Sequence, residues 1–354
     1  MSQDLLALTE TLCEIPSVSG TEAALADVVE ARLRKHAGPL QIERIGSNVV
    51  ARTELGRPQR IVLGGHLDTV PANGNAAPRR EGDVLHGLGT ADMKGGLAIL
   101  LALADDLASE KARFDVTLVL YDGEEVADEH NGLRRLFAET PALVQGDLAI
   151  MLEPTGGWVE AGCQGTINVR AVFDGVRAHT ARPWMGKNAI HRSAALLDFC
   201  AKFEAATVDV DSLAYREALQ VVRIEGGVAN NVVPDRCSVV VNRRYAPSRA
   251  LEDAVNEVVT FCTDAGADHT EVLNASTAAP PNLMNPLIAE LIGVYDLPVR
   301  PKLGWTDVGR FAAHGIPACN FGPGDPELAH TADERVDGAT LDACLALLQR
   351  FLGV

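Results

Sequence analysis

The chain lacks the features that define several common classes of protein. No window approaches eighteen uninterrupted apolar residues, so we expect no helix that spans a membrane. The first ten residues have neither a basic start nor an apolar run, so we expect no signal peptide. Basic residues are scarce, because 31 Lys and Arg face 48 Asp and Glu, for a net charge of −17. That charge argues against nucleic acid or an anionic membrane as a partner.

Cysteine is also sparse and has no motif. The seven cysteines are odd in number and scattered, with no Cys-x-x-Cys pair. This pattern fits a reducing cytoplasm and excludes a zinc site built from paired thiolates. Any metal ion would therefore be bound by histidines and carboxylates. With 354 residues, of which 47% are hydrophobic, the chain can form two domains with sizeable cores.

Strands and helices alternate in the first part of the chain, which predicts an α/β fold. Apolar runs typical of buried strands lie at 60–63, 116–121 and 148–152, and a helical pattern covers 97–107. Charged residues follow the three strand ends: His66, Glu124, Glu125 and Glu153. Because α/β sheets gather such residues at the carboxyl ends of their strands, we expect one shared site there.

The stretch from Ile61 to Pro71 suggests the chemistry of that site. His66 and Asp68 would point to the same side of an extended chain. An imidazole beside a carboxylate suggests a metal ligand and the partner that fixes its tautomer, although the pair could also merely cap a loop. Carboxylates gathered in one cleft repel each other, and a pair of divalent cations removes that repulsion.

The pattern changes after residue 160. Extended segments at 166–173, 219–225 and 236–245 alternate with helical patterns at 188–203 and 249–264. Elsewhere, helix is expected from Asp4 to about His36 with a break at 15–20, and from Leu341 to Leu352. We therefore predict one domain from 1–165 plus 275–354, with an α+β domain of 166–274 inserted in it.

Four motifs in order resemble those of a known family. They are His66-x-Asp68-Thr69-Val70-Pro71, Gly89-x-x-Asp92-Met93-Lys94-Gly95, Glu124-Glu125 and Glu153-Pro154. Their order and spacing are similar to those of the di-zinc aminoacylase/carboxypeptidase metallopeptidase family, over nearly the whole chain. The resemblance implies a di-zinc exopeptidase-type catalytic α/β domain with an inserted α+β lid and dimerisation domain, and hence a homodimer.

The same resemblance implies roles for individual residues of the first domain. His66 and Glu153 would bind one zinc ion, Glu125 and His330 the other, and Asp92 would bridge the two. The cofactors would be two Zn²⁺, which Co²⁺ or Mn²⁺ can replace. Asp68 would orient His66, Glu124 would be the general base, and the peptide bond after Asp92 would be cis.

In the inserted domain, the resemblance points to an oxyanion donor and to substrate contacts. His179 lies in a motif whose histidine reaches the active site of the partner subunit, where it would stabilise the tetrahedral oxyanion. The implied substrate contacts are Asn230, Asn231, Arg244, Gly304 and Thr306, with Arg182 as a further hypothesis. Arg182 would replace a cation that other members of the family carry where this chain has Cys163-Gln164.

Within the family, three segments are most similar to an actinobacterial branch. They are 160–166, 304–308 and 320–326. That branch hydrolyses the small molecule N-succinyl-LL-2,6-diaminopimelate to succinate and LL-2,6-diaminopimelate, in lysine and diaminopimelate biosynthesis. Two alternatives stay open: another N-acyl amino acid deacylase or dipeptidase on the same scaffold, and a non-catalytic regulatory member.

Overall fold

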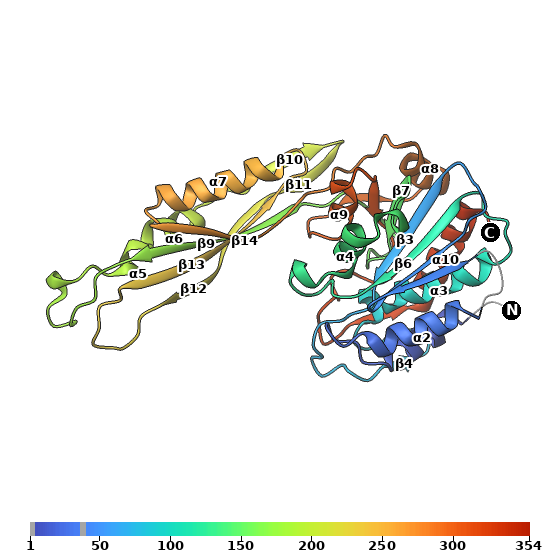
Figure 1. The fold of residues 1–354 in the computed structure, drawn as a ribbon, viewed down its shortest axis with the longest axis horizontal. Helices are drawn as coiled ribbons and strands as arrows, with labels where there is room; N and C mark the ends of the chain where they lie inside the picture. Colours follow the sequence, from blue (N-terminus) through green and yellow to red (C-terminus); the bar gives the residue numbers. More distant parts are fainter. Residues whose placement is uncertain (1–3, 36–39) are drawn as a thin grey trace. The chain divides into compact units, whose positions relative to one another are not determined.

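The computed structural model describes residues 4–35 and 40–354, which form two compact units (Figure 1). The first unit comprises the described residues up to Ala161 together with Asn282–Arg300 and Arg310–Val354. The second comprises Gly162–Pro281 and Pro301–Gly309. These bounds differ from the sequence-based ones at 162–165, where the second unit begins earlier than expected, and at two later segments, 275–281 and 301–309. The two later segments contact the start of the second unit, where Cys163 N donates to Ala279 O and Gln164 N donates to Lys302 O.

An eight-stranded mixed sheet forms the centre of the first unit. Its order is β1-β2-β6-β3-β7-β16-β8-β15. The strands are β1 (Gln41–Ile45), β2 (Asn48–Arg52), β3 (Arg60–His66), β6 (Asp115–Tyr121), β7 (Leu148–Met151), β8 (Val159–Ala161), β15 (Val299–Pro301) and β16 (Ala318–Asn320). β3 lies between β6 and β7 and is parallel to both. The three strands expected to share a site are thus neighbours, which confirms the predicted α/β class.

Helices cover this sheet, and a small second sheet lies beside it. The helices are α1 (Leu5–Cys13), α2 (Ala23–Leu33), α3 (Gly95–Leu107), α4 (Gly132–Glu139), α8 (Pro286–Tyr295), α9 (Val308–Ala313) and α10 (Gly338–Leu352). The second sheet contains β4 (Arg79–Glu81), β5 (Val84–His86) and β17 (Arg335–Asp337). The expected break at 15–20 lies between α1 and α2, and His36 itself lies outside the described residues.

Close packing of α3 against β3 depends on a glycine. A Cβ added at Gly65 would lie 2.7 Å from the Met93 Cε atom and 3.1 Å from a Leu97 methyl group. α3 also contacts α1 and α10, and ten of its thirteen residues from Gly95 to Ala104 are buried without interruption. A strand that ends in Gly64-Gly65-His66 therefore lets the helix approach, and the histidine then emerges at the edge of a rigid core.

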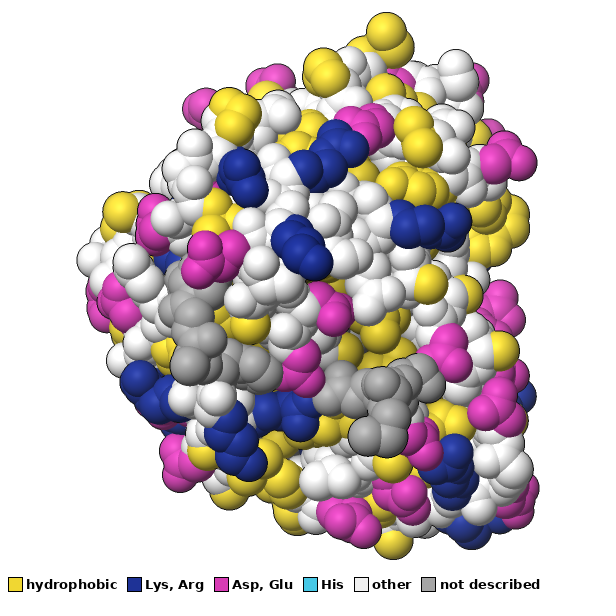
Figure 2. All heavy atoms as spheres, turned by 90° about the vertical axis from the view of Figure 1, so that its right-hand side faces the viewer, with side chains coloured by type: hydrophobic (Ala, Val, Ile, Leu, Met, Phe, Trp, Pro, Cys, Tyr) yellow, Lys and Arg dark blue, Asp and Glu magenta, His cyan; other side chains and the backbone are white. Residues whose placement is uncertain are grey.

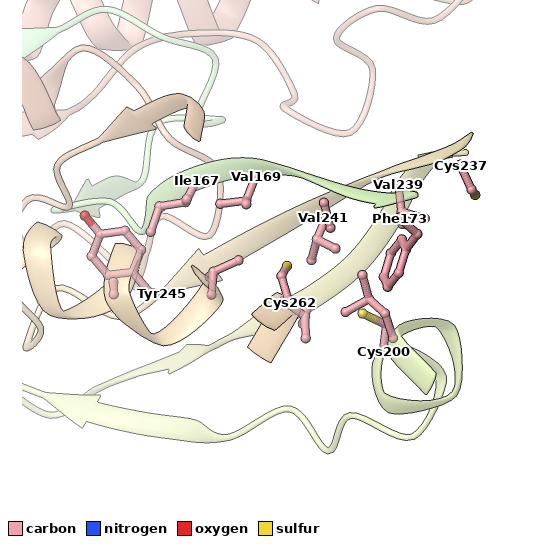
Figure 3. Packing of buried hydrophobic residues seen from close by; sticks show 14 of the residues in the cluster. Ile167, Val169, Phe173, Cys200, Cys237, Val239, Val241, Tyr245 and Cys262 are labelled. Carbon is pink, nitrogen blue, oxygen red and sulfur yellow. The ribbon is translucent and has the colours of Figure 1, made fainter. Parts of the chain in front are cut away.

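The second unit is an antiparallel sheet covered by helices on one face. Its strand order is β12-β13-β9-β14. The strands are β9 (Gly165–Asp174), β12 (Ala218–Gly226), β13 (Arg236–Tyr245) and β14 (His269–Ser276), with a separate hairpin of β10 (Thr207–Val210) and β11 (Leu213–Arg216). The helices are α5 (Ala189–Arg192), α6 (Ala194–Ala201) and α7 (Leu251–Asp264). Their apolar sides meet one face of the sheet in a core that includes Val169, Phe173, Val241 and Cys262 (Figure 3).

The surface carries charges of both signs. Figure 2 shows basic and acidic side chains interspersed over one face of the molecule, with apolar side chains scattered among them. This face therefore has no extended basic patch.

Among the described residues, no helix combines the length and the apolar character that crossing a bilayer requires.

Candidate metal centre

The ends of β3, β6 and β7 bring the predicted ligands together. His66 lies opposite Tyr121 in the parallel pairing of β3 with β6, and Gly64 lies opposite Met151 in the pairing with β7. The three strands thus end almost level, and their following residues share one edge of the sheet. His66 is 1% exposed and Glu153 is 5% exposed, so these two side chains belong to the buried interior.

Two groups of ligand atoms overlap at one aspartate. The ligand atoms of His66, Asp92 and Glu153 lie within 4.8 Å of one another, and so do those of Asp92, Glu125 and His330. All five residues predicted as metal ligands are therefore brought together, and Asp92 belongs to both groups. Two histidines with three carboxylates and no thiolate form a donor set that suits zinc in a hydrolytic site. The residues fit a pair of ions that share Asp92.

The two histidines lie between the carboxylates and contact them directly. His66 Nε2 lies 3.0 Å from Asp92 Oδ1, and His330 Nε2 lies 2.8 Å from Glu125 Oε1 and 3.4 Å from Asp92 Oδ2. Hydrogen bonds with Asp92 and Glu125 raise the pKa of His330 to about 10. Burial lowers the pKa of His66, but its contacts with Asp68 and Asp92 outweigh this and raise it well above the usual value.

Asp68 acts on three neighbours at once. His66 Nδ1 lies 3.0 Å from the Asp68 backbone oxygen, which can only accept, so in the neutral ring the proton sits on Nδ1 and Nε2 is left for a metal ion. The Asp68 carboxylate lies farther from Nδ1, at 3.5 Å. It accepts hydrogen bonds from the backbone N–H groups of Glu124 and Glu125, both at 3.0 Å. The orientation of His66 thus comes first from the Asp68 backbone, while the side chain fixes the loop of the two glutamates.

Burial and neighbouring groups shift the pKa values of Asp68 and Asp92 in opposite directions. Burial raises the pKa of Asp68, but His66, the Glu125 N–H group and the Ser19 hydroxyl lower it to about 2. Ser19 Oγ donates to Asp68 Oδ2 at 2.7 Å, from the break between α1 and α2. Burial likewise raises the pKa of Asp92, whereas the two histidines hold it well below its usual range. Both aspartates are therefore ionised and ready to accept from N–H groups or to bind cations.

The loop that carries Asp92 has an unusual backbone. Gly89 has φ of +77°, a left-handed conformation that favours glycine, and the Asp92–Met93 peptide bond is cis as the resemblance implied. The buried Lys94 donates to the backbone oxygens of Leu12 and Ile15 at 3.2 and 2.9 Å. These contacts anchor the loop to the end of α1.

Sequence reasoning missed two residues beside the ligands, Ser19 and Glu334. The Glu334 carboxylate is 1% exposed and accepts hydrogen bonds from three backbone N–H groups of the Asp92 loop. Burial raises the pKa of Glu334 to about 7, against the effect of those N–H groups. Neither residue stands in a recognisable motif, so only the three-dimensional contacts reveal them.

The remaining predicted site residues lie in the second unit. They are His179, Arg182, Asn230, Asn231, Arg244, Gly304 and Thr306. The loop of His179 is joined to the Asn230-Asn231 turn, because Thr180 N donates to Asn231 O and Val233 N donates to Ala178 O. Asn230 and Asn231 are exposed, whereas Thr306 is only 5% exposed. Trp305 has a structural contact, since its indole N–H donates to the backbone oxygen of Thr277 at 3.1 Å.

The site combines an α/β sheet with two overlapping groups of histidine and carboxylate side chains at the ends of its central strands. This combination is typical of metallohydrolases. Residues 62–353 match the model of Peptidase family M20/M25/M40, and the chain belongs to this family of hydrolases. The family match confirms the resemblance that the four motifs suggested, and with it the two-domain α/β fold class.

Similar proteins are found in actinobacteria and beyond. A Mycobacterium tuberculosis protein that bears the name succinyl-diaminopimelate desuccinylase DapE is 49% identical, covering 99% of this chain and 98% of the relative. A Corynebacterium glutamicum succinyl-diaminopimelate desuccinylase is 44% identical, over 99% of this chain and 96% of its own. The solved structure of the Sulfolobus solfataricus M20 family metallo-carboxypeptidase Sso-CP2 has a TM-score of 0.80 at 17% identity, covers 99% of both chains and has the same fold.

Metal binding should release protons, because contacts with carboxylates raise the pKa values of His66 and His330. A histidine ligand must be neutral, so at pH 8 we expect the release of about two protons per chain, one from each imidazole. Affinity for Zn²⁺ should rise with pH as far as the pKa of His330, about 10. Calorimetric titrations in buffers of different ionisation enthalpy measure this release.

A matched pair of variants tests the origin of the protons. His330→Asn should reduce the release by about one proton, whereas His314→Asn, which alters a histidine stacked on Phe137, should not change it. Zinc uptake without proton release would contradict the assigned ligands.

Proposed function

We propose that this chain hydrolyses N-succinyl-LL-2,6-diaminopimelate to succinate and LL-2,6-diaminopimelate. The observation that carries the proposal is the complete set of five ligands in two groups that share Asp92. The names of the two relatives at 49% and 44% identity support the choice of substrate. The cofactors would be two Zn²⁺, and the free, buried state of all seven cysteines fits a cytoplasmic location.

Glu124 is the proposed general base. An oxygen of its carboxylate lies within 4.8 Å of ligand atoms of His66 and Glu125, so Glu124 lies beside the candidate metal centre. Two bound metal ions would polarise the amide carbonyl and lower the pKa of the attacking water. Glu124 takes a proton from that water and later gives it to the departing amine. The Asp68 carboxylate holds the Glu124 backbone N–H at 3.0 Å and so keeps the base in place.

His179 of the partner subunit is the proposed oxyanion donor in a homodimer. His179 Nδ1 accepts a hydrogen bond from Ala181 N at 3.0 Å, so the proton of the neutral ring resides on Nε2. The side chain is exposed, which leaves that N–H group ready to donate. A donor aimed at developing negative charge is what stabilisation of a tetrahedral intermediate requires.

Arg244 and Arg182 are the proposed partners of substrate carboxylates. Successive residues of β13 face opposite sides, so Arg243 is buried against Glu217 whereas Arg244 is half-buried on the other side. Within the described residues, Arg244 and Arg182 have no ion pair. Burial lowers the pKa of Arg244, and a partly buried cation of this kind is stabilised by an incoming anion. A dicarboxylic amino acid joined to succinate would supply such anions.

A substrate panel tests the proposed activity. The zinc-loaded chain should release primary amine from N-succinyl-LL-2,6-diaminopimelate with a higher kcat/KM than from acetylornithine or dipeptides. Glu124→Gln serves as the control for background turnover and should lower kcat about 10²–10⁴-fold, because it removes the base while keeping its shape. Preference for acetylornithine would indicate another deacylase, and preference for dipeptides a peptidase. Full activity of Glu124→Gln would contradict the mechanism.

The role of Arg182 is tested through substrate affinity. Arg182→Ala should mainly raise KM for the succinylated substrate, by about tenfold, because the loss of one charged hydrogen bond is worth about 1.5 kcal/mol. Arg223→Ala is the matched control, since it removes an exposed cation that pairs with Glu225 in the same unit. An unchanged KM in Arg182→Ala would rule out the role.

A further inference from the structure

Glu334 is a buried carboxylate that faces backbone rather than solvent. It lies four residues after His330, immediately before β17, and is 1% exposed. Oε1 accepts from Ala91 N and Asp92 N, both at 3.0 Å, and Oε2 accepts from Gly89 N at 3.1 Å. We infer that Glu334 is a positioning residue for the metal centre, which fixes the backbone of Asp92 and thereby sets the affinity for both ions. This inference rests on the metal site proposed above.

The Asp92 loop cannot satisfy these N–H groups by itself. Asp92 has φ −121° and ψ 91°, outside the helical region, so the turn at Thr90–Lys94 is interrupted at the ligand. Within it, Lys94 N donates to Gly89 O and Thr90 N donates to Gly87 O. One carboxylate therefore supplies the acceptors for the N–H groups of Gly89, Ala91 and Asp92, and a buried N–H without an acceptor costs about 1–3 kcal/mol.

The same residue joins the segments of two ligands. Its backbone oxygen accepts from Gly87 N at 2.9 Å, and β17 pairs with β5 so that Arg335 lies opposite His86. Asn75 Nδ2 also donates to Thr331 O at 3.1 Å. The chain that carries His330 is thus fastened to the chain that carries Asp92, with the Glu334 carboxylate between them. Because Asp92 belongs to both ligand groups, a shift of its backbone would disturb both ions.

Asp115 provides a matched control in the same unit. It is a buried carboxylate that accepts from Leu55 N at 2.7 Å, Arg57 N at 2.9 Å and the Thr53 hydroxyl at 3.1 Å. It begins β6, whereas Glu124 and Glu125 follow the end of that strand. Asp115→Asn therefore weakens a loop anchor of the same kind at the opposite end of the sheet.

The experiment measures Zn²⁺ binding by the metal-stripped full chain in competition with a chromophoric chelator. Glu334→Gln keeps the side-chain shape but places an amide donor against a backbone donor. We expect it to raise the dissociation constants of both ions about 10–100-fold, the usual effect of removing a partner that orients a ligand. Asp115→Asn should lower the unfolding temperature of the metal-free chain without changing either constant. Excess Zn²⁺ should restore the activity of Glu334→Gln.

Each outcome decides between a positioning role and a merely structural one. Equal Zn²⁺ affinities in Glu334→Gln and the parent chain would overturn the inference, and so would equal losses in Asp115→Asn. If Glu334→Gln does not fold, Glu334→Asp, which keeps the charge but withdraws the acceptors by one methylene group, is held to the same criterion. A parent chain that binds two Zn²⁺ but does not hydrolyse the succinylated substrate would refute the proposed function alone.

Discussion

The structure depends on bringing mutually repelling carboxylates together at the ends of three parallel strands. Two histidines lie among the carboxylates of Asp92, Glu125 and Glu153. The Asp68 carboxylate lies next to one of these histidines, His66. The imidazoles offset this charge, as the raised pKa values of His66 and His330 indicate. Bound cations would take over that role. The need to neutralise the carboxylates thus links the positions of these side chains, the sheet that places them and the chemistry proposed for them.

Backbone hydrogen bonds, more than contacts between side chains, keep this charged cluster in position. The Asp68 carboxylate holds the backbone of Glu124 and Glu125, and the Asp68 backbone oxygen fixes the tautomer of His66. The Glu334 carboxylate does for the Asp92 loop what Asp68 does for the glutamates. Ligands held in this way need little rearrangement when a cation binds, which is the condition for a preorganised site.

Much of this arrangement could be predicted from the sequence because its signals are local. The β-forming runs of β3, β6 and β7 and the charged residues after them predicted the shared edge. The family resemblance predicted the five residues that the structure brings together and the cis bond at Asp92. Glu334 and Ser19 could not be predicted, since each acts on a segment that is distant in sequence. The contact of 301–309 with the second unit was missed for the same reason, because Gln164 donates to the backbone oxygen of Lys302, which is distant in sequence.

The central claim is that two metal ions share Asp92. Anomalous X-ray scattering from crystals of the zinc-loaded chain, recorded on both sides of the zinc absorption edge, tests it most directly. The account predicts two zinc peaks about 3.5–4 Å apart, one within bonding distance of His66 and Glu153, the other of Glu125 and His330, with Asp92 bound to both. A single peak, or two zinc ions that do not share Asp92, would contradict it.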